Sequence, residues 1–186
     1  VILADDWRLN KNYQIDEKSF GSLMDWSHAG RVGNWLTING EKSPQYSIKA
    51  NSRARLRFIN ASNARVLKFG SSLKNNNIIA IDGVAVKPML VKNFTLAPGQ
   101  RIDLLINTVD LLKVDFFEIS HTKQLKAFTL NVTKADNKTK DIANINFTSN
   151  WILPKSDNTK TISIRMQGGA MGNLSKANLD GVEKDF

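Results

Sequence analysis

Residues 78–106 read IIAIDGVAVKPMLVKNFTLAPGQRIDLLI and contain the turn signals that decide the fold. Asp82-Gly83 is a two-residue hairpin signal between apolar runs. Pro98-Gly99 is a second corner, because proline presets φ for position i+1 of a turn and glycine accepts the positive φ that a type II turn needs at i+2. Residues 102–106 then alternate so that one strand face is apolar. Residues 96–106 hold no nucleophile, general base or metal ligand, so this part of the stretch is interpreted as architectural.

The same pattern of short apolar segments and polar turns recurs along the chain. The intervals are about 8 to 12 residues, which is typical of sandwiches and barrels. Only residues 17–26 and 109–113 have helical character. We therefore predict an all-β, Greek-key β-sandwich with antiparallel strands. The expected strands are 1–9, 34–38, 46–50, 54–61, 65–69, 78–81, 84–86, 90–96, 102–106, 114–119 and 128–133, with Pro88 interrupting the chain between two of them.

The chain divides into a sandwich and a tail. Residues 1–154 are expected to form the domain, and residues 155–186 a connector that leads away from it, because the tail is polar and has three glycines within five residues. Residues 161–166 alternate as an isolated late strand. The side chains expected in the sandwich core are Leu56, Phe58, Ile79, Ile81, Leu104, Ile106 and Phe128.

Composition excludes several classes of function. The net charge is +9, but the basic residues are scattered and are not interleaved with stacking aromatics, so we expect no nucleic-acid partner. Arg53, Arg55 and Arg57 alternate along one strand and are interpreted as solvated surface. No apolar run reaches the roughly 20 residues of a membrane span. Cysteine is absent, which excludes thiolate catalysis and cysteine-ligated metal within the chain.

The remaining candidates for chemistry are isolated side chains. His28 and His121 have no acid or second imidazole at ligand spacing, so both are interpreted as structural or surface residues. The Asp5-Asp6 pair suits a capping or interface role better than acid–base work, because neighbours on a strand point to opposite faces. Met166 and Met171 are soft enough to contact Cu(I), but packing explains two methionines as well. We therefore predict no catalytic, cofactor-binding or metal-binding residue.

Other possible sites are equally weak. Ser27 beside His28 is no triad, because adjacency in sequence does not provide its geometry. The glycines of HAGRVGN at residues 28–34 lack the strand-then-helix context of a phosphate loop. The four tryptophans are interpreted as core or interface residues: Trp7, Trp26, Trp35 and Trp151.

Four stretches together resemble the second cupredoxin-like domain of three-domain bacterial multicopper oxidases, of the laccase or cuprous oxidase type. They are LADDWRL at 3–9, GNWLTING at 33–40, RARLRFINAS at 53–62 and the opening stretch at 78–106. MQGGAMGNL at 166–174 and LDG at 179–181 resemble the passage into a third domain. The resemblance covers nearly the whole chain in the right order.

The resemblance implies a structural middle domain that binds no copper. In such oxidases type 1 copper lies in domain three, and the trinuclear cluster takes ligands from domains one and three. Electrons from a phenol-like substrate or a metal ion then reduce oxygen to water. The implied partners are the flanking domains, and the implied location is periplasmic or secreted. No signal peptide is visible, and the strand-like start at Val1 suggests a segment cut from a longer protein.

An alternative parent stays open. A bacterial subgroup with the same three-domain plan has lost copper and serves as a periplasmic cell-division scaffold. Because domain two supplies no copper ligand in either case, these residues do not separate an enzymatic parent from a structural one. His-X-His and His-Cys-His motifs in the flanking domains would do so.

Overall fold

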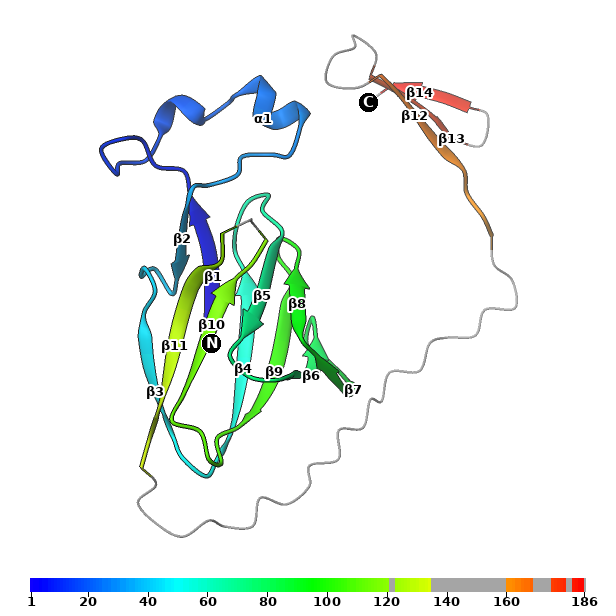
Figure 1. The fold of residues 1–186 in the computed structure, drawn as a ribbon. Helices are drawn as coiled ribbons and strands as arrows, with labels where there is room; N and C mark the ends of the chain where they lie inside the picture. The colour runs from blue at the N-terminus through cyan, green and yellow to red at the C-terminus, as the bar shows by residue number, and fades with distance from the viewer. Residues whose placement is uncertain (121–122, 135–159, 169–174, 180–181, 186) are drawn as a thin grey trace.

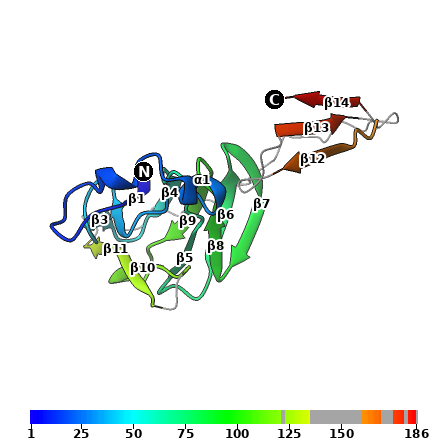
Figure 2. The same cartoon turned by 90° about the horizontal axis from the view of Figure 1, so that it is seen from above.

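Two packed sheets form the body of the molecule in the computed structural model (Figures 1 and 2). The structure describes residues 1–186 except 121–122, 135–159, 169–174, 180–181 and 186. One sheet has the strand order β2-β1-β4-β9-β6-β7, and the other has the order β3-β11-β10-β5-β8. The all-β sandwich is confirmed.

Most strands lie within a few residues of their predicted positions. The first sheet contains β1 (Ile2–Trp7), β2 (Trp35–Ile38), β4 (Arg53–Asn60), β6 (Asn76–Ile81), β7 (Val84–Val91) and β9 (Arg101–Asn107). The second contains β3 (Gln45–Lys49), β5 (Leu67–Ser71), β8 (Asn93–Leu96), β10 (Lys113–Glu118) and β11 (Leu125–Thr133). Asp82 and Gly83 have positive φ, as the predicted hairpin turn requires, and Asn39 and Gly40 have positive φ as well.

The expectation that all strands are antiparallel is wrong at two pairings. β1 pairs with β4 in parallel, with Ile2 opposite Phe58, and β3 pairs with β11 in parallel, with Gln45 opposite Thr129. In each case the chain passes through other strands before it returns beside the first one. Such a connection can bring a strand back in either direction, whereas a tight hairpin can only reverse it.

Pro88 does not interrupt its strand, contrary to the prediction. β7 runs from Val84 to Val91 and lies at the edge of the first sheet. An edge strand tolerates proline, because the missing N–H can belong to the unpaired side. The break comes at Lys92 instead, between β7 and β8.

The helical segments are shorter than predicted. Residues 17–26 contain a 3-10 turn, η1 (Glu17–Ser19), and a single α-helix, α1 (Leu23–Ser27). The predicted helix at 109–113 is wrong, because residues 109–112 form the turn that leads into β10 and Lys113 is the first residue of that strand. Asp110 has φ 58°, a left-handed conformation that stops a helix from continuing.

Phenylalanine side chains join the two sheets. Phe58 of the first sheet lies with its ring centroid 5.0 to 5.8 Å from four phenylalanine rings of the second. These four are Phe69, Phe94, Phe116 and Phe128. All seven residues predicted for the core are buried except Ile81, which is half-buried and packs at the margin of the core.

The tail contains more strand than predicted. β12 (Ile164–Gly168), β13 (Ser175–Leu179) and β14 (Val182–Asp185) form a three-stranded antiparallel sheet of their own. The late strand expected at 161–166 is therefore displaced to 164–168, and it pairs within the tail. Both views draw this sheet apart from the sandwich (Figures 1 and 2). The boundary near residue 154 falls outside the described residues and stays a prediction.

Candidate interdomain surface

Residues 8–34 leave the first sheet as one long excursion that carries η1 and α1. Trp7 at the end of β1 and Trp35 at the start of β2 are paired, so the excursion begins and ends at one point of the sheet. Figure 1 shows it extending beyond one end of the sandwich. This segment is the largest departure from a plain sandwich within residues 1–134.

Polar contacts hold the excursion in a defined shape. Both oxygens of Asp25 accept from Arg8 Nη1, at 3.0 and 2.8 Å. Ser22 caps α1 by accepting from the Asp25 N–H at 3.4 Å, and Arg31 Nε donates to Ser19 Oγ at 3.0 Å. The excursion lies outside the apolar core. The salt bridge and the helix cap therefore restrict its backbone in place of core packing.

The excursion is also anchored at its return to the sheet. Gly33 N donates to Asp6 Oδ2 at 2.6 Å, and Arg65 Nε donates to the same oxygen at 2.8 Å. A Cβ on Gly33 would lie 2.7 Å from the Asp6 carbonyl carbon, so only glycine allows this approach. Asp6 thus has the capping role predicted for the Asp5-Asp6 pair. The pKa of the neighbouring Asp5 is raised, mainly because its carboxylate is partly buried. The hydrogen bond that the Asp6 N–H donates to Asp5 Oδ1 lowers this pKa, whereas the negative charge of Asp6 raises it.

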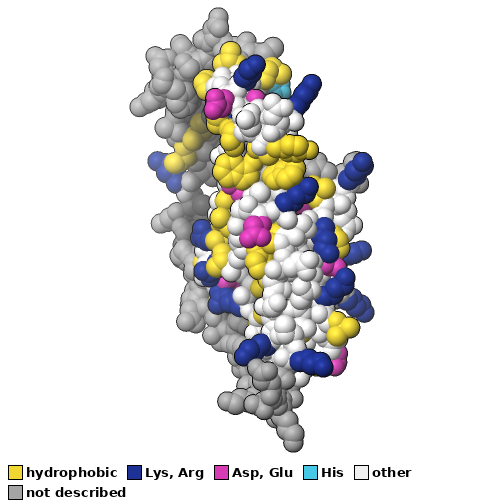
Figure 3. Space-filling model, turned by 90° about the vertical axis from the view of Figure 1, so that its left-hand side faces the viewer, with side chains coloured by type: hydrophobic (Ala, Val, Ile, Leu, Met, Phe, Trp, Pro, Cys, Tyr) yellow, Lys and Arg dark blue, Asp and Glu magenta, His cyan; other side chains and the backbone are white. Residues whose placement is uncertain are grey.

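The excursion presents an unusual number of large apolar side chains to solvent. Their exposed fractions are 74% for Trp26 and Leu23, 73% for Tyr13, 67% for Met24 and 59% for Phe20. Figure 3 shows hydrophobic side chains gathered toward this end of the molecule. A segment that exposes several large apolar side chains is a candidate interaction site. We call the surface formed by these five side chains the apolar patch.

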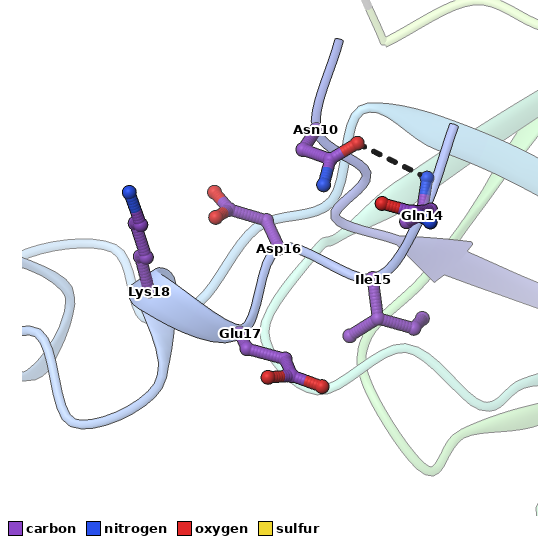
Figure 4. Close-up of a pocket in the computed structure, with 6 residues that line it drawn as sticks. All are labelled: Asn10, Gln14, Ile15, Asp16, Glu17 and Lys18. Atoms are coloured by element: carbon purple, nitrogen blue, oxygen red, sulfur yellow. Dashed lines mark hydrogen bonds between the residues drawn. The ribbon is translucent and has the colours of Figure 1, made fainter. Parts of the chain in front are cut away.

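The excursion also forms a polar hollow of about 570 Å³ (Figure 4). It is lined by residues 14–18 and by Asn10, whose Oδ1 accepts from the Gln14 backbone N–H at 3.1 Å. The hollow contains two carboxylates, those of Asp16 and Glu17. Asp16 Oδ2 lies 3.8 Å from Arg8 Nε, so this carboxylate has a cationic neighbour. The residues lining the hollow include no histidine, serine or cysteine, and no catalytic arrangement is formed by them.

The candidate metal-binding residues that the structure describes do not form a ligand cluster. His28 is exposed at the end of α1, where its Nδ1 lies 3.0 Å from both Ser27 Oγ and Met24 O. His121 and Met171 are outside the described residues, and Met166 lies in β12. Among the residues that the structure describes, no three His, Cys, Asp or Glu side chains could together hold a metal ion. The described residues therefore do not fit a copper centre.

Other residues considered in the sequence also have structural positions. Trp7 donates through Nε1 to Thr37 Oγ1 at 3.2 Å, and Lys42 Nζ lies 4.3 Å above the ring of Trp35. Trp151 is outside the described residues. Gly30 approaches Ala64 so closely that an added Cβ would be 2.5 Å from the alanine Cβ, which indicates packing and not a phosphate loop.

Two ion-pair clusters were missed in the sequence. Arg55 and Arg57 both bind the buried carboxylate of Asp103, with 2.8 Å from Arg57 Nε to Oδ1. Their interpretation as solvated surface is therefore incomplete. Arg65 binds the buried Asp6 in the same way. No residue pattern at a fixed spacing predicts these ion pairs, because they depend on the register of strands that are distant in the sequence.

Comparison with known proteins identifies the family. A model of the multicopper oxidase family matches residues 1–138, about three quarters of the chain. The chain belongs to this family. In β1 to β11 it has the form of a cupredoxin-like domain, as the sequence resemblance implied.

Curated relatives of this multicopper oxidase chain include cell-division proteins. The protein named "Cell division protein FtsP" of Pectobacterium atrosepticum is 37% identical over 83 residues, which are 44% of this chain and 17% of that protein. Its namesake in Photorhabdus laumondii is 36% identical over 108 residues, 57% of this chain and 21% of that protein. The chain thus spans about a fifth of the length of these relatives.

Solved multicopper oxidases share the fold. The McoA multicopper oxidase of Aquifex aeolicus has a TM-score of 0.69 at 18% identity, covering 97% of this chain and 40% of that one. The laccase-like oxidase CueO of Ochrobactrum sp. has a TM-score of 0.69 at 24% identity, covering 83% and 34%. Within the described residues, no helix is long and apolar enough to cross a membrane.

Proposed function

We propose that this chain supplies the middle, non-copper-binding domain of a multidomain multicopper oxidase and positions the domains on either side of it. The apolar patch carries this proposal. Five large apolar side chains, each at least 59% exposed, lie on one short segment that is held in place by salt bridges and a helix cap. A rigid apolar surface of this kind suits a permanent intramolecular contact. The flanking cupredoxin domains are the proposed partners.

The activity proposed for the whole protein is that of an oxidase. It would oxidise a phenol-like compound or a metal ion and reduce oxygen to water, with type 1 and trinuclear copper in the flanking domains. Family membership supports this proposal. The solved proteins that this chain resembles include a laccase-like multicopper oxidase of Ochrobactrum sp. and a metallo-oxidase of Campylobacter jejuni. A periplasmic or secreted location follows from the same reasoning.

The positioning role can be tested in the full-length protein with Leu23→Ser and its matched control Leu112→Ser. Both leucines are exposed in residues 1–186, but Leu112 lies outside the apolar patch. Thermal unfolding should begin several degrees lower in L23S and be nearly unchanged in L112S, because only Leu23 loses a buried interdomain contact. Equal behaviour of the two variants would contradict the proposed contact.

The cell-division relatives favour a second candidate function. Relatives 32 to 37% identical to this chain are named cell-division proteins, whereas the solved oxidases above are 18 to 24% identical. In this alternative the chain is the middle domain of a copper-free scaffold protein, and the apolar patch serves the same packing role.

Copper analysis of the purified full-length protein distinguishes the two parents. An oxidase should contain copper, show the intense visible absorption of a copper–thiolate centre and consume oxygen with a phenol or Cu(I). A scaffold should show none of these after incubation with copper, and deletion of its gene should impair cell division. Sequencing the flanks for His-X-His and His-Cys-His motifs provides an independent check.

A further inference from the structure

A pocket of about 370 Å³ lies between the excursion and the sandwich. Its walls are formed by the end of β1, by the excursion and by the loop after β4: Asp5, Asp6, Trp7, Ile15, Phe20, Arg31, Ala61 and Asn63. Phe20 belongs to the apolar patch, so the pocket opens beside the surface proposed to contact a neighbouring domain. We call it the Asp6–Arg31 pocket.

One wall contributes a buried hydrogen-bond acceptor. The Asp6 side chain is only 1% exposed. Its Oδ2 already accepts from Gly33 N and Arg65 Nε. Its Oδ1 is buried and has no hydrogen-bond partner among the described residues. A buried carboxylate oxygen without a partner destabilises the protein, because it has lost its hydrogen bonds to water and gained none in exchange.

The excursion contributes a buried donor to the same pocket. Arg31 Nε donates to Ser19 Oγ at 3.0 Å, and the guanidinium carbon lies 4.3 Å from the centre of the Phe20 ring. These contacts fix the guanidinium. Its Nη2 is nevertheless buried without a hydrogen-bond partner among the described residues. Native proteins seldom leave such groups unpaired, so each points to a group that completes it.

The two unpaired atoms define the chemistry of what would fit. A ligand that satisfied both atoms would donate to Asp6 Oδ1 and accept from Arg31 Nη2. A carboxylate would be repelled by Asp6 and Asp5, and an ammonium group offers Arg31 nothing to bind. An amide is neutral and carries both an N–H donor and a carbonyl acceptor. Its apolar neighbours could pack on Trp7, Ile15 and Phe20, which line the same pocket.

We infer that the Asp6–Arg31 pocket receives an amide group, a backbone peptide or an Asn or Gln side chain, from a neighbouring domain of the same protein. This inference rests on the proposed interdomain role. The chain covers only 34 to 40% of the solved relatives that it matches, so other polypeptide of the parent is available to supply the group. The apolar patch alone provides no directional contact. The hydrogen bonds of the amide would fix the orientation of the neighbouring domain.

A high-resolution crystal structure of the unmodified full-length protein is the first test. An amide nitrogen and oxygen should lie within about 3.2 Å of Asp6 Oδ1 and Arg31 Nη2, respectively. Ordered water alone, or a charged side chain, in the pocket would overturn the inference. If the apolar patch is covered while the pocket holds only water, the proposed function stands and the amide inference fails. A solvent-exposed patch would defeat both.

Hydrogen–deuterium exchange of full-length variants is the second test. Arg31→Lys keeps the charge and the stem but removes Nη2. Arg101→Lys is the matched control, because Arg101 Nη2 donates to Asp82 O at 3.1 Å on the sandwich itself. Exchange in one segment outside residues 1–186 should rise about tenfold in R31K, the effect of one lost hydrogen bond of about 1.4 kcal/mol, and stay unchanged in R101K. Unchanged exchange in R31K would also overturn the inference.

Discussion

Single carboxylates connect strands that are far apart in the sequence. Asp103 is 2% exposed in its side chain and binds two arginines that are themselves about half exposed. Burial raises the pKa of Asp103, but hydrogen bonds from Arg57 and Arg55, helped by their positive charges, lower it below its ordinary value. The carboxylate is therefore charged at neutral pH, and its two partners make the outer face of the first sheet polar and ordered.

We predict that Asp103→Asn lowers the free energy of unfolding by about 2 kcal/mol, because two arginines lose a charged partner that the amide replaces poorly. Urea denaturation of the full-length protein measures the change. Asp110→Asn, in an exposed turn, is the control and should differ from wild type by less than about 0.5 kcal/mol. A neutral result for D103N would mean that the cluster contributes little to stability.

Asp115 predicts a dependence of stability on acid pH. Hydrogen bonds from Lys126 and Thr129 lower its pKa from 3.8 to about 2, against a smaller opposing effect of burial. A group whose folded pKa is depressed stabilises the fold above the unfolded value, and this contribution is lost as pH falls from about 4 to about 2. Unfolding free energies measured through this range should fall less steeply in Asp115→Asn than in wild type. Parallel curves would contradict the assignment.

At the scale of elements, close backbone approach determines how the excursion meets the sheet. Gly33 lies where β2 begins, against the backbone of Asp6 and Trp7 at the end of β1. Because the obstructing atoms belong to the main chain, a side chain at this position cannot be accommodated by a rotamer change. The position of the apolar patch relative to the sandwich therefore depends on this glycine.

Gly33→Ala should destabilise the protein by about 3 kcal/mol through overpacking against backbone. Gly40→Ala is the matched control. Gly40 has φ 83° but no atom within 4 Å of an added Cβ, so its substitution should cost only the backbone strain, about 1 kcal/mol. Thermal unfolding of both variants measures the difference. If the two variants lose the same stability, the tight approach at Gly33 is not limiting.

At the scale of the whole molecule, one side chain joins the two layers. Phe58 is fully buried and contacts four phenylalanines of the opposite sheet. Phe58→Ala should lower the free energy of unfolding by about 4 kcal/mol, through lost burial and the cavity that remains. Phe20→Ala in the isolated chain should be nearly neutral, because Phe20 is 59% exposed there. Comparable losses in chemical denaturation would argue against Phe58 as the centre of the core.

The separate tail sheet predicts a proteolytic pattern. Lys160 is exposed and precedes β12, while Lys176 lies within β13 and pairs with β14. Trypsin should cut first near Lys155 or Lys160 and leave a resistant domain of about 150 residues. Mass spectrometry of timed digests identifies the products. A tail as resistant as the sandwich would contradict the expected boundary between residues 154 and 155.

The fold class and most strand positions could be predicted from the sequence, because apolar alternation, Asp82-Gly83 and Pro98-Gly99 are local signals whose effect on the backbone depends on few neighbours. The sequence also indicated the family through stretches that are contiguous in the chain. Only the tertiary structure decided the parallel pairings, the passage of β7 through Pro88, the binding of two arginines by Asp103 and the pocket between Asp6 and Arg31. These features depend on strand register and edge position, which bring together residues such as Asp6 and Arg65 from distant parts of the sequence.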